Sequence, residues 1–365
     1  MIGVYLHVPF CLSKCPYCDF YSLAGAGEAE KDAYAAAVKR VLATAPVTGA
    51  DTLYFGGGTP SLLGGKRIAA LIDTVRDTVG LTSDAEITLE ANPGDPLDEL
   101  FAAFAAAGGN RVSLGAQAAD DRALASLGRR HTVADTVRAT DAAHKAGLYN
   151  LSLDLMLATP GQTVGDIRKA VRLFDELGAV HLSAYLLKLE PATPFGKDPP
   201  PLPDEDGAAD RYLAAAEALA ERGFAQYEIS NFAKPGRQSR HNLKYWDQQP
   251  YWGIGPAAHS FLNGKRFYYP RSLTAFLNGE PPLFEPDGEY PAGSAAEYAL
   301  LRLRLTEGLT EAGFYERFGT AVPAVYKKRA AALPRTLVQT DGDGIRLTAQ
   351  GFLVSNAIIA NILEG

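Results

Sequence analysis

The strongest constraint on the fold is the alternation of short β-rich runs with helical stretches over the first two thirds of the 365 residues. Consecutive strands separated by helices pair in parallel through right-handed crossovers, and their helices bury the resulting sheet. Six such units fall short of the eight that close a barrel. We therefore expect an open, partial (β/α)6 barrel with its ligand site at the carboxyl ends of the strands. The runs are GVYLHV from Gly3, DTLYFGG from Asp51, EITLEAN from Glu86, NRVSLGAQ from Asn110, NLSLDLM from Asn150 and VHLSAYLL from Val180.

The pattern changes after Leu187, and the chain divides into three parts. Residues 1–225 are assigned to the barrel and include a proline-rich, acidic loop followed by a further helix. Residues 226–290 are dense in aromatic, glycine and histidine residues and are expected to be a connecting segment. Residues 291–365 are mostly helical, with an Asp-Gly hairpin signal in LVQTDGDGIRLT. Helices followed by a hairpin predict a smaller, winged-helix-like domain, and its mixed charge favours a structural or partner-docking role over DNA binding.

All three cysteines of the chain stand together as Cys11-x3-Cys15-x2-Cys18, on the loop after the first β-rich run. A cubane iron–sulfur cluster takes one thiolate per iron, so three thiolates leave the fourth iron open to an outside ligand. A structural zinc site would need a fourth ligand such as His7, and this spacing is not a usual one for zinc. A disulfide with a spare thiol would need an oxidising compartment. We predict a [4Fe-4S] cluster, with zinc or a disulfide as the alternatives.

The composition is that of a chain with a sizeable core and an acidic balance of charge. Hydrophobic residues make up 47% of the chain, and the formal net charge is −7, which argues against a broad nucleic-acid-binding face. The sequence has no apolar run long enough to cross a bilayer and no cleavable signal pattern. We expect a cytoplasmic protein that binds no nucleic acid and is not integral to a membrane.

Glycine and polar residues gather where the β-rich runs end, on the expected ligand side of the barrel. Gly57, Gly58 and Thr59 follow the second run, where glycines allow close approach to a ligand and offer backbone N–H groups. Buried polar groups need partners, and a polar ligand would supply them. Each residue alone is also compatible with a turn, a cap or a surface position. The polar side chains in or beside the later runs are Glu90, Gln117, Arg129 and Asp154.

Strings spread over nearly the whole chain resemble the radical S-adenosylmethionine (SAM) family. The resemblance is to the branch around oxygen-independent coproporphyrinogen III oxidase and the HemW haem chaperones. These strings are YLHVPFC, YFGGGTPS, LEANPG, RVSLGAQ, DLMLATPGQT, YEISNFA, SRHNLKYW and GIGPAAHSF. One departure is Ala158-Thr159, where relatives usually carry Gly-Leu. The resemblance implies that the three cysteines hold a [4Fe-4S] cluster whose open iron binds SAM. It also implies that SAM is contacted by Tyr5, Gly57, Gly58, Thr59, Glu90, Gln117, Arg129 and Asp154.

Two features favour the chaperone side of this branch. The oxidases carry a fourth cysteine two positions after the third, where this chain has Phe20, and a longer segment before the cysteines. The string His241-Asn242-x-x-Tyr245-Trp246 resembles the proposed haem-binding motif of the chaperones. His241 is then the candidate iron ligand, with Tyr245 and Trp246 against the apolar face of the macrocycle. The same segment is also compatible with a structural core, and His259 is a competing ligand.

The resemblance implies a haem chaperone that binds haem, a [4Fe-4S] cluster and SAM and transfers haem to an acceptor haemoprotein. An electron donor for the cluster is a further expected partner, and no catalytic residue is assigned. The alternatives are an oxygen-independent coproporphyrinogen III oxidase, acting by oxidative decarboxylation, and a radical SAM enzyme with another substrate. The chain is expected to be a monomer or a homodimer.

Overall fold

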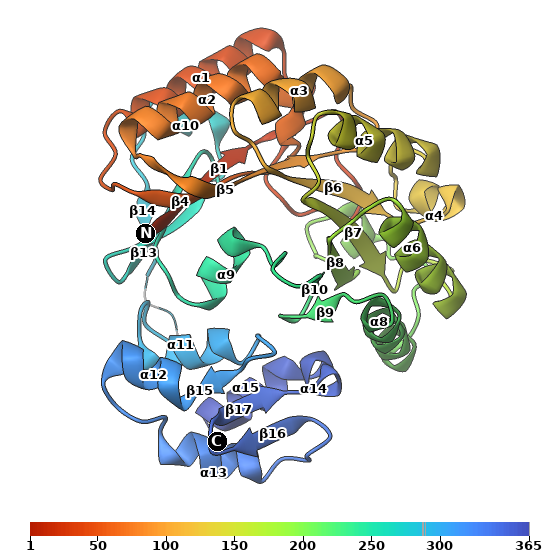
Figure 1. The fold of residues 1–365 in the computed structure, drawn as a ribbon, viewed down its shortest axis with the longest axis vertical. Helices are drawn as coiled ribbons and strands as arrows, with labels where there is room; N and C mark the ends of the chain where they lie inside the picture. The colour runs from red at the N-terminus through yellow and green to blue at the C-terminus, as the bar shows by residue number, and fades with distance from the viewer. Residues whose placement is uncertain (287, 289, 365) are drawn as a thin grey trace.

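A curved sheet covered on its outer face by helices dominates the computed structural model, which describes residues 1–286, 288 and 290–364 (Figure 1). The sheet has twelve strands in the order β14-β13-β12-β11-β1-β4-β5-β6-β7-β8-β10-β9, and neighbours from β1 to β8 pair in parallel. The prediction of a partial barrel with six parallel strands is therefore confirmed. These strands are β1 (Ile2–Val8), β4 (Ala50–Gly57), β5 (Leu81–Ala91), β6 (Arg111–Gln117), β7 (Leu151–Leu157) and β8 (His181–Leu186).

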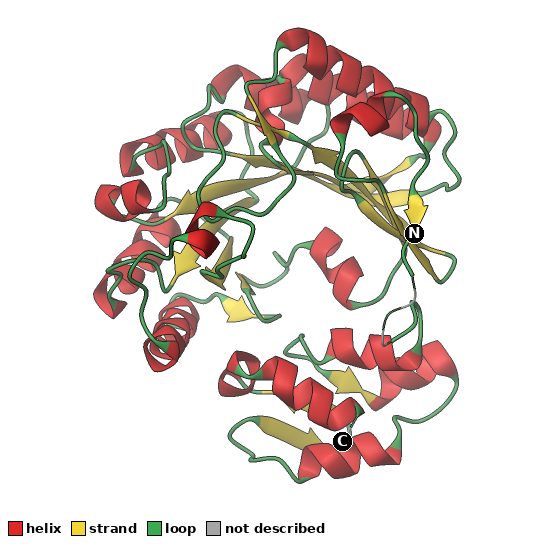
Figure 2. Ribbon diagram, turned by 180° about the vertical axis from the view of Figure 1, so that it is seen from behind, coloured by secondary structure: helices red, strands yellow, loops and turns green. Residues whose placement is uncertain are grey.

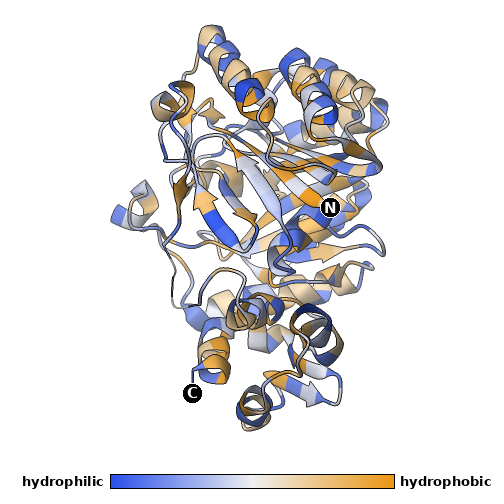
Figure 3. Cartoon of the chain, turned by 90° about the vertical axis from the view of Figure 1, so that its left-hand side faces the viewer, coloured by the Kyte–Doolittle hydropathy of each residue, from blue (hydrophilic) through white to orange (hydrophobic). Residues whose placement is uncertain are grey.

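A long helix follows each of the six parallel strands and lies on the convex face of the sheet (Figure 1). Two of these helices begin with a capping box, at Thr132 and Thr163, so the sequence fixes their first turns locally. Apolar and polar residues alternate around the outer helices, as expected for helices with one face on a sheet (Figure 3). The helices are α1 (Glu28–Leu42), α2 (Gly65–Thr78), α3 (Asp98–Ala106), α5 (Val133–Lys145), α6 (Val164–Glu176) and α8 (Glu205–Ala220). Shorter helices are η1 (Pro60–Leu63), α4 (Asp121–Ser126) and α7 (Pro194–Lys197), the last within the predicted proline-rich loop.

The concave face of the barrel is polar. Apolar residues of the strands, such as Val4 and Leu6 of β1, are fully buried in the core shared with the helices. Successive side chains of a strand point to opposite faces, so the residues between them face the interior. There they pair with one another across strands: the Tyr54 hydroxyl donates to Glu90 at 2.7 Å, and Ser152 lies 2.7 Å from His181. Polar groups that hydrogen-bond across the strands therefore lie in the barrel interior.

The segment 226–290 is more than the connection that the sequence predicts, because it extends the sheet at both edges. The string FAQYEISNFA forms two short strands, β9 (Ala225–Gln226) and β10 (Asn231–Ala233), which pair antiparallel beside β8. β11 (Tyr251–Ile254) pairs in parallel with β1. Antiparallel strands β12 (His259–Leu262), β13 (Lys265–Tyr268) and β14 (Leu283–Phe284) continue from β11, with α10 (Leu273–Leu277) between the last two. The domain boundaries at 225 and 290 stay a prediction.

Helix α9 (Arg240–Trp246) lies on the concave side of the sheet and covers the amino end of the barrel (Figure 1). The Glu86 carboxylate accepts the backbone N–H groups of Arg240 and His241 at 3.1 and 3.0 Å, which satisfies the first turn of the helix. Lys244 pairs with Asp51 at 2.7 Å. The amino end of the barrel is thereby occupied by the chain itself, which leaves the carboxyl end for a ligand.

The C-terminal part is a separate group of helices around a three-stranded sheet in the order β15-β17-β16 (Figure 2). The expected hairpin is present as an antiparallel pair, and the mostly helical, winged-helix-like prediction is confirmed; the short strand β15 was not foreseen. Arg302 pairs with Asp247 directly after α9, which ties this part to the barrel. Its elements are α11 (Ala295–Arg302), β15 (Leu309–Thr310), α12 (Glu311–Phe318), α13 (Ala324–Ala331), β16 (Val338–Asp341), β17 (Gly344–Leu347), α14 (Ala349–Leu353) and α15 (Ser355–Leu363). Within the described residues, we find no helix with the length and apolar character to cross a membrane.

Candidate functional site

The three cysteines line a cleft of about 560 Å³ at the carboxyl ends of the parallel strands. The loop that carries them is closed by a two-residue parallel pairing of β2 (Phe10–Cys11) with β3 (Leu23–Ala24). His7 also holds the loop, since its Nε2 lies 3.0 Å from the carbonyl oxygen of Tyr21. Burial lowers the pKa of His7 to about 4, so this imidazole is neutral and donates to that carbonyl. The chain therefore shapes the cysteine loop through backbone pairing and one fixed histidine.

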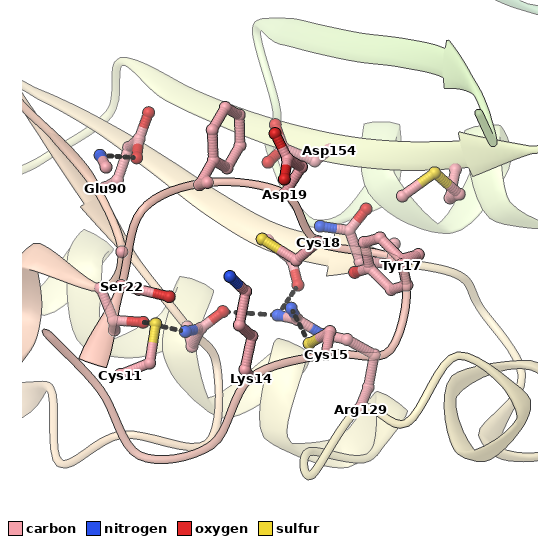
Figure 4. A pocket seen from close by; sticks show the side chains of 18 of the residues that line it. Cys11, Lys14, Cys15, Tyr17, Cys18, Asp19, Ser22, Glu90, Arg129 and Asp154 are labelled. Carbon is pink, nitrogen blue, oxygen red and sulfur yellow. Dashed lines mark hydrogen bonds between the residues drawn. The ribbon is translucent and has the colours of Figure 1, made fainter. Parts of the chain in front are cut away.

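The cysteine side chains project from this one loop into the cleft (Figure 4). Cys11 Sγ lies 3.5 Å from Thr59 Oγ1, and Arg129 donates from Nη1 to Cys15 Sγ at 3.5 Å. Burial raises the pKa of the Cys18 thiol. Among the described residues, no three His, Cys, Asp or Glu side chains converge on a single metal-ion position. Three thiols from one loop along one cleft fit a cluster that takes one thiolate per iron.

The glycine-rich turn after β4 lies directly against the cysteine loop. A Cβ at Gly58 would come within 2.7 Å of the Phe10 carbonyl oxygen, so only glycine fits there without a shift of the backbone. The N–H groups of Gly58 and Thr59 donate to the carbonyl oxygens of Val8 and Phe10 at 2.8 and 2.7 Å. These two N–H groups are therefore used within the chain, and the Gly57 N–H donates to Glu90. Contact of the turn with SAM stays a prediction. The turn still lines the cleft through Gly57, Gly58 and Thr59.

Two half-buried carboxyl groups, Glu90 on β5 and Asp154 on β7, line the cleft. Glu90 accepts from the Tyr54 hydroxyl at 2.7 Å and from Gly57 N–H at 3.2 Å, yet burial raises its pKa to about 7. Burial likewise raises the pKa of Asp154 to about 6, against hydrogen bonds from Tyr185 and Ser183 that lower it. Both groups therefore change charge close to neutral pH, where a cationic ligand would favour the ionised forms.

Arg129 and Gln117 bring unsatisfied polar atoms to the same cleft. Gln117 ends β6 with φ of 65°, and its Oε1 is buried without a hydrogen-bond partner among the described residues. Arg129 Nε is likewise unpartnered within that part of the chain, while its Nη2 donates to the Gly115 carbonyl oxygen at 2.8 Å and to Asn92. Buried polar atoms are normally hydrogen-bonded, so these two fit a polar ligand in the cleft.

Asn92 is a site residue that the sequence reasoning missed. Its Nδ2 donates to Thr59 Oγ1 at 2.9 Å and its Oδ1 accepts from Arg129, so it joins the glycine turn to the arginine beside Cys15. Asn92 stands two residues after Glu90 and directly after β5, where continued strand spacing would put it on the same face as Glu90. That spacing is the signal that could have found it.

Tyr5 lies deeper in the barrel than expected and lines a second cleft, of about 530 Å³, beside the first. Its hydroxyl donates to His7 Nδ1 at 3.0 Å. The two clefts share Asp19 and Phe20 of the cysteine loop, and the Phe20 side chain is 69% exposed. Contact of Tyr5 with SAM stays a prediction. We call the second hollow the aromatic cleft, after its lining residues Phe20, Tyr21, Tyr245, Tyr251, Tyr268 and Tyr269.

The structure places His241 of the expected haem motif inside the barrel, only 1% exposed. One ring nitrogen lies 2.7 Å from Thr52 Oγ1 and the other 2.9 Å from the Tyr245 hydroxyl. Burial lowers the pKa of His241 to about 3, so the ring is neutral. Ligation of haem iron by His241 would require the hydrogen bond on the ligating nitrogen to break and the ring to become accessible from its buried position. Tyr245 of the same motif does reach the aromatic cleft, and Trp246, half-buried, ends α9.

A six-stranded partial barrel with a three-cysteine loop over the ligand cleft defines the radical SAM class of proteins. A family model described as the Radical SAM superfamily matches residues 5–174, and one described as the HemN C-terminal domain matches residues 294–354. The solved structure of coproporphyrinogen III oxidase from Escherichia coli, a radical SAM enzyme, superposes with a TM-score of 0.83. That alignment covers 100% of this chain and 90% of the oxidase at 20% identity, and it establishes the shared fold.

Curated relatives specify the family more narrowly. The haem chaperone HemW of Mycobacterium tuberculosis is 39% identical, over 99% of this chain and 94% of its own length. HemW of Escherichia coli is 36% identical, over 98% of this chain and 97% of its own length. The chain belongs to the HemW family.

Proposed function

We propose that this protein is a haem chaperone, which binds haem and transfers it to an acceptor haemoprotein. The observation that carries this proposal is the 39% identity, over nearly the whole of both chains, to a relative named as a haem chaperone. The similarity of fold to coproporphyrinogen III oxidase does not discriminate between the two functions, because it rests on 20% identity. Phe20, in place of the fourth cysteine of the oxidases, also favours the chaperone. We place its activity in the cytoplasm.

We further propose that the first cleft holds a [4Fe-4S] cluster on Cys11, Cys15 and Cys18, with SAM beside it. When bound, the cluster would supply one-electron redox chemistry next to SAM, for which an electron-donor protein is the expected partner. The chain contributes the shape of the cysteine loop and a polar floor under it. The SAM contacts proposed from Glu90, Gln117, Arg129 and Asp154 are supported by their place in the cleft and by the unpartnered atoms of Gln117 and Arg129.

The positions of charge in the cleft suit SAM, which carries a carboxylate and a positively charged sulfonium. Arg129 offers a guanidinium nitrogen without a partner among the described residues, suited to the carboxylate. Glu90 and Asp154 lie across the floor, and their ionised forms would stabilise a nearby cation or accept hydroxyl groups of the ribose. The residues of this chain thus bind and orient the ligand, and none of them is assigned to proton transfer.

Anaerobic titration of the cluster-reconstituted protein with haemin tests the chaperone directly. We expect saturable binding, at about one haem per chain, and transfer of the bound haem to an added apo-haemoprotein such as apomyoglobin. Deoxyadenosine formation should be followed in parallel. Absence of saturable haem binding, together with deoxyadenosine release that depends on added coproporphyrinogen III, would replace the chaperone by the oxidase.

A further inference from the structure

Histidine is the most common protein ligand to haem iron in haem-binding proteins, and the six histidines of this chain differ sharply in availability. Four of them are buried and use ring nitrogens in hydrogen bonds within the protein: His7, His131, His181 and His241. His144 lies on the outer helix α5 and stacks on Tyr149. His259 alone combines an exposed side chain, 55% accessible, with a position in a cleft.

His259 has a carboxylate beside one ring nitrogen, which is the usual environment of a metal-ligating histidine. Its Nδ1 lies 3.4 Å from the Glu285 carboxylate, and its ring stacks on Tyr268 with centroids 5.3 Å apart. A carboxylate on one ring nitrogen fixes the tautomer and makes the other nitrogen a better ligand. Within the described residues no hydrogen bond to Nε2 is found, and the His259 side chain lines the aromatic cleft.

The aromatic cleft offers surfaces that match a flat macrocycle with acidic side groups. Tyrosine rings from α9, β11 and β13 line it, and aromatic faces pack well against a porphyrin. Arg271 stands at the rim with a 55% exposed side chain, held by contacts to Asp19, and its guanidinium suits a haem propionate. The volume of about 530 Å³ falls in the usual range for small-molecule sites.

We propose that haem binds in the aromatic cleft with His259 Nε2 as an axial ligand to iron and with Glu285 positioning the imidazole. This inference rests on the proposed haem-chaperone function and names the site for it. Since the two clefts share Asp19 and Phe20, haem there would lie against the loop that carries the cysteines. A change in that loop would then alter how tightly haem is held.

Haemin titrations of five forms of the full-length, cluster-reconstituted protein test the site: wild type, His259→Ala, Glu285→Gln, His241→Ala and His144→Ala. The last is a matched control, because His144 stacks on Tyr149 with the same 22° interplanar angle and nearly the same spacing, away from the cleft. We expect the Soret band of bound haem to shift in His259→Ala and affinity to fall about tenfold or more, with a smaller loss in Glu285→Gln. Added imidazole should restore the wild-type Soret band to His259→Ala, because it can replace the missing ligand. It would not restore the band if the substitution had only damaged the structure of the cleft.

The outcomes separate this inference from the proposed function. If wild type binds haemin saturably and His259→Ala keeps the same affinity and Soret band, the site assignment fails and the chaperone function stands. If His241→Ala loses haemin affinity instead, while circular dichroism shows an intact fold, the axial ligand is His241 of α9. An equal loss in His144→Ala would also overturn the assignment, because the effect would not be specific to the cleft. Failure of wild type to bind at all would remove the proposed function, and the haem site with it.

Discussion

Replacing Glu90 with glutamine should change how the stability of the protein depends on pH. Burial raises the pKa of Glu90 from 4.5 to about 7. The folded carboxyl therefore holds its proton more tightly than the unfolded one, and its ionisation opposes folding. The stabilising effect of the bound proton is present below pH 4.5 and is lost as pH rises through 7. The difference between these two pKa values corresponds to about 3 kcal/mol of unfolding free energy between pH 4.5 and pH 8.

Glutamine removes this titration but keeps the shape of the side chain. Its amide oxygen can still accept from Tyr54, whereas its NH2 group would face the Gly57 N–H, at a constant cost of about 1–2 kcal/mol. Urea unfolding of the apo protein under reductant, at pH 4.5 and pH 8, measures the effect. As pH rises from 4.5 to 8, we expect the unfolding free energy of Glu90→Gln to increase by about 3 kcal/mol relative to that of wild type. Asp154 titrates in both proteins, so its contribution to the pH dependence largely cancels in the comparison. Parallel pH profiles would refute the raised pKa.

Three further changes test the site and the backbone. Cys18→Ala should prevent stable cluster assembly, measured as iron and sulfide per chain after anaerobic reconstitution; full loading would refute the three-thiolate site. Gly58→Ala should lower the unfolding free energy by about 1–3 kcal/mol and disturb the cysteine loop, because its Cβ would meet the Phe10 carbonyl oxygen at 2.7 Å. Gly342→Ala, in the turn between β16 and β17 where the space is open, is the matched control in urea unfolding, and equal losses in both would contradict the clash. Ala158, at φ of 58°, is in a conformation that favours glycine, so Ala158→Gly should stabilise by about 1 kcal/mol; a lower thermal midpoint would contradict that strain.

Local patterns in the sequence predicted the core of the fold. The alternation of β-rich runs with helical stretches predicts a parallel sheet with one end for ligands, and the six strands are present at the expected positions. The cysteine spacing likewise predicts the cluster loop, because ligands for one cluster can all come from a short stretch of chain. The glycine turn lies where the sequence predicted it, beside the ligand cleft. From the sequence we expect its N–H groups to face a ligand, whereas those of Gly58 and Thr59 bond to Val8 and Phe10.

The parts that the sequence did not predict depend on contacts between distant segments. Strand β11 pairs with β1, about 250 residues away along the chain, and no local pattern marks that partner. Asn92 becomes a site residue only because β4 and β5 are neighbours, which places it against Thr59 and Arg129. Sequence motifs name residue types and spacing, whereas these contacts depend on which strands lie side by side.

The sequence by itself determined the six-unit barrel, the cysteine loop and the membership of the branch, because each is written in short-range spacing. Only the tertiary structure distinguished among the histidines. His241 stands in the expected motif, yet α9 carries it into the barrel, where Thr52 and Tyr245 occupy both of its ring nitrogens. His259 lines the aromatic cleft, and its Nε2 has no hydrogen bond within the described part of the chain. A ligand needs an accessible lone pair, and accessibility is set by how distant segments pack.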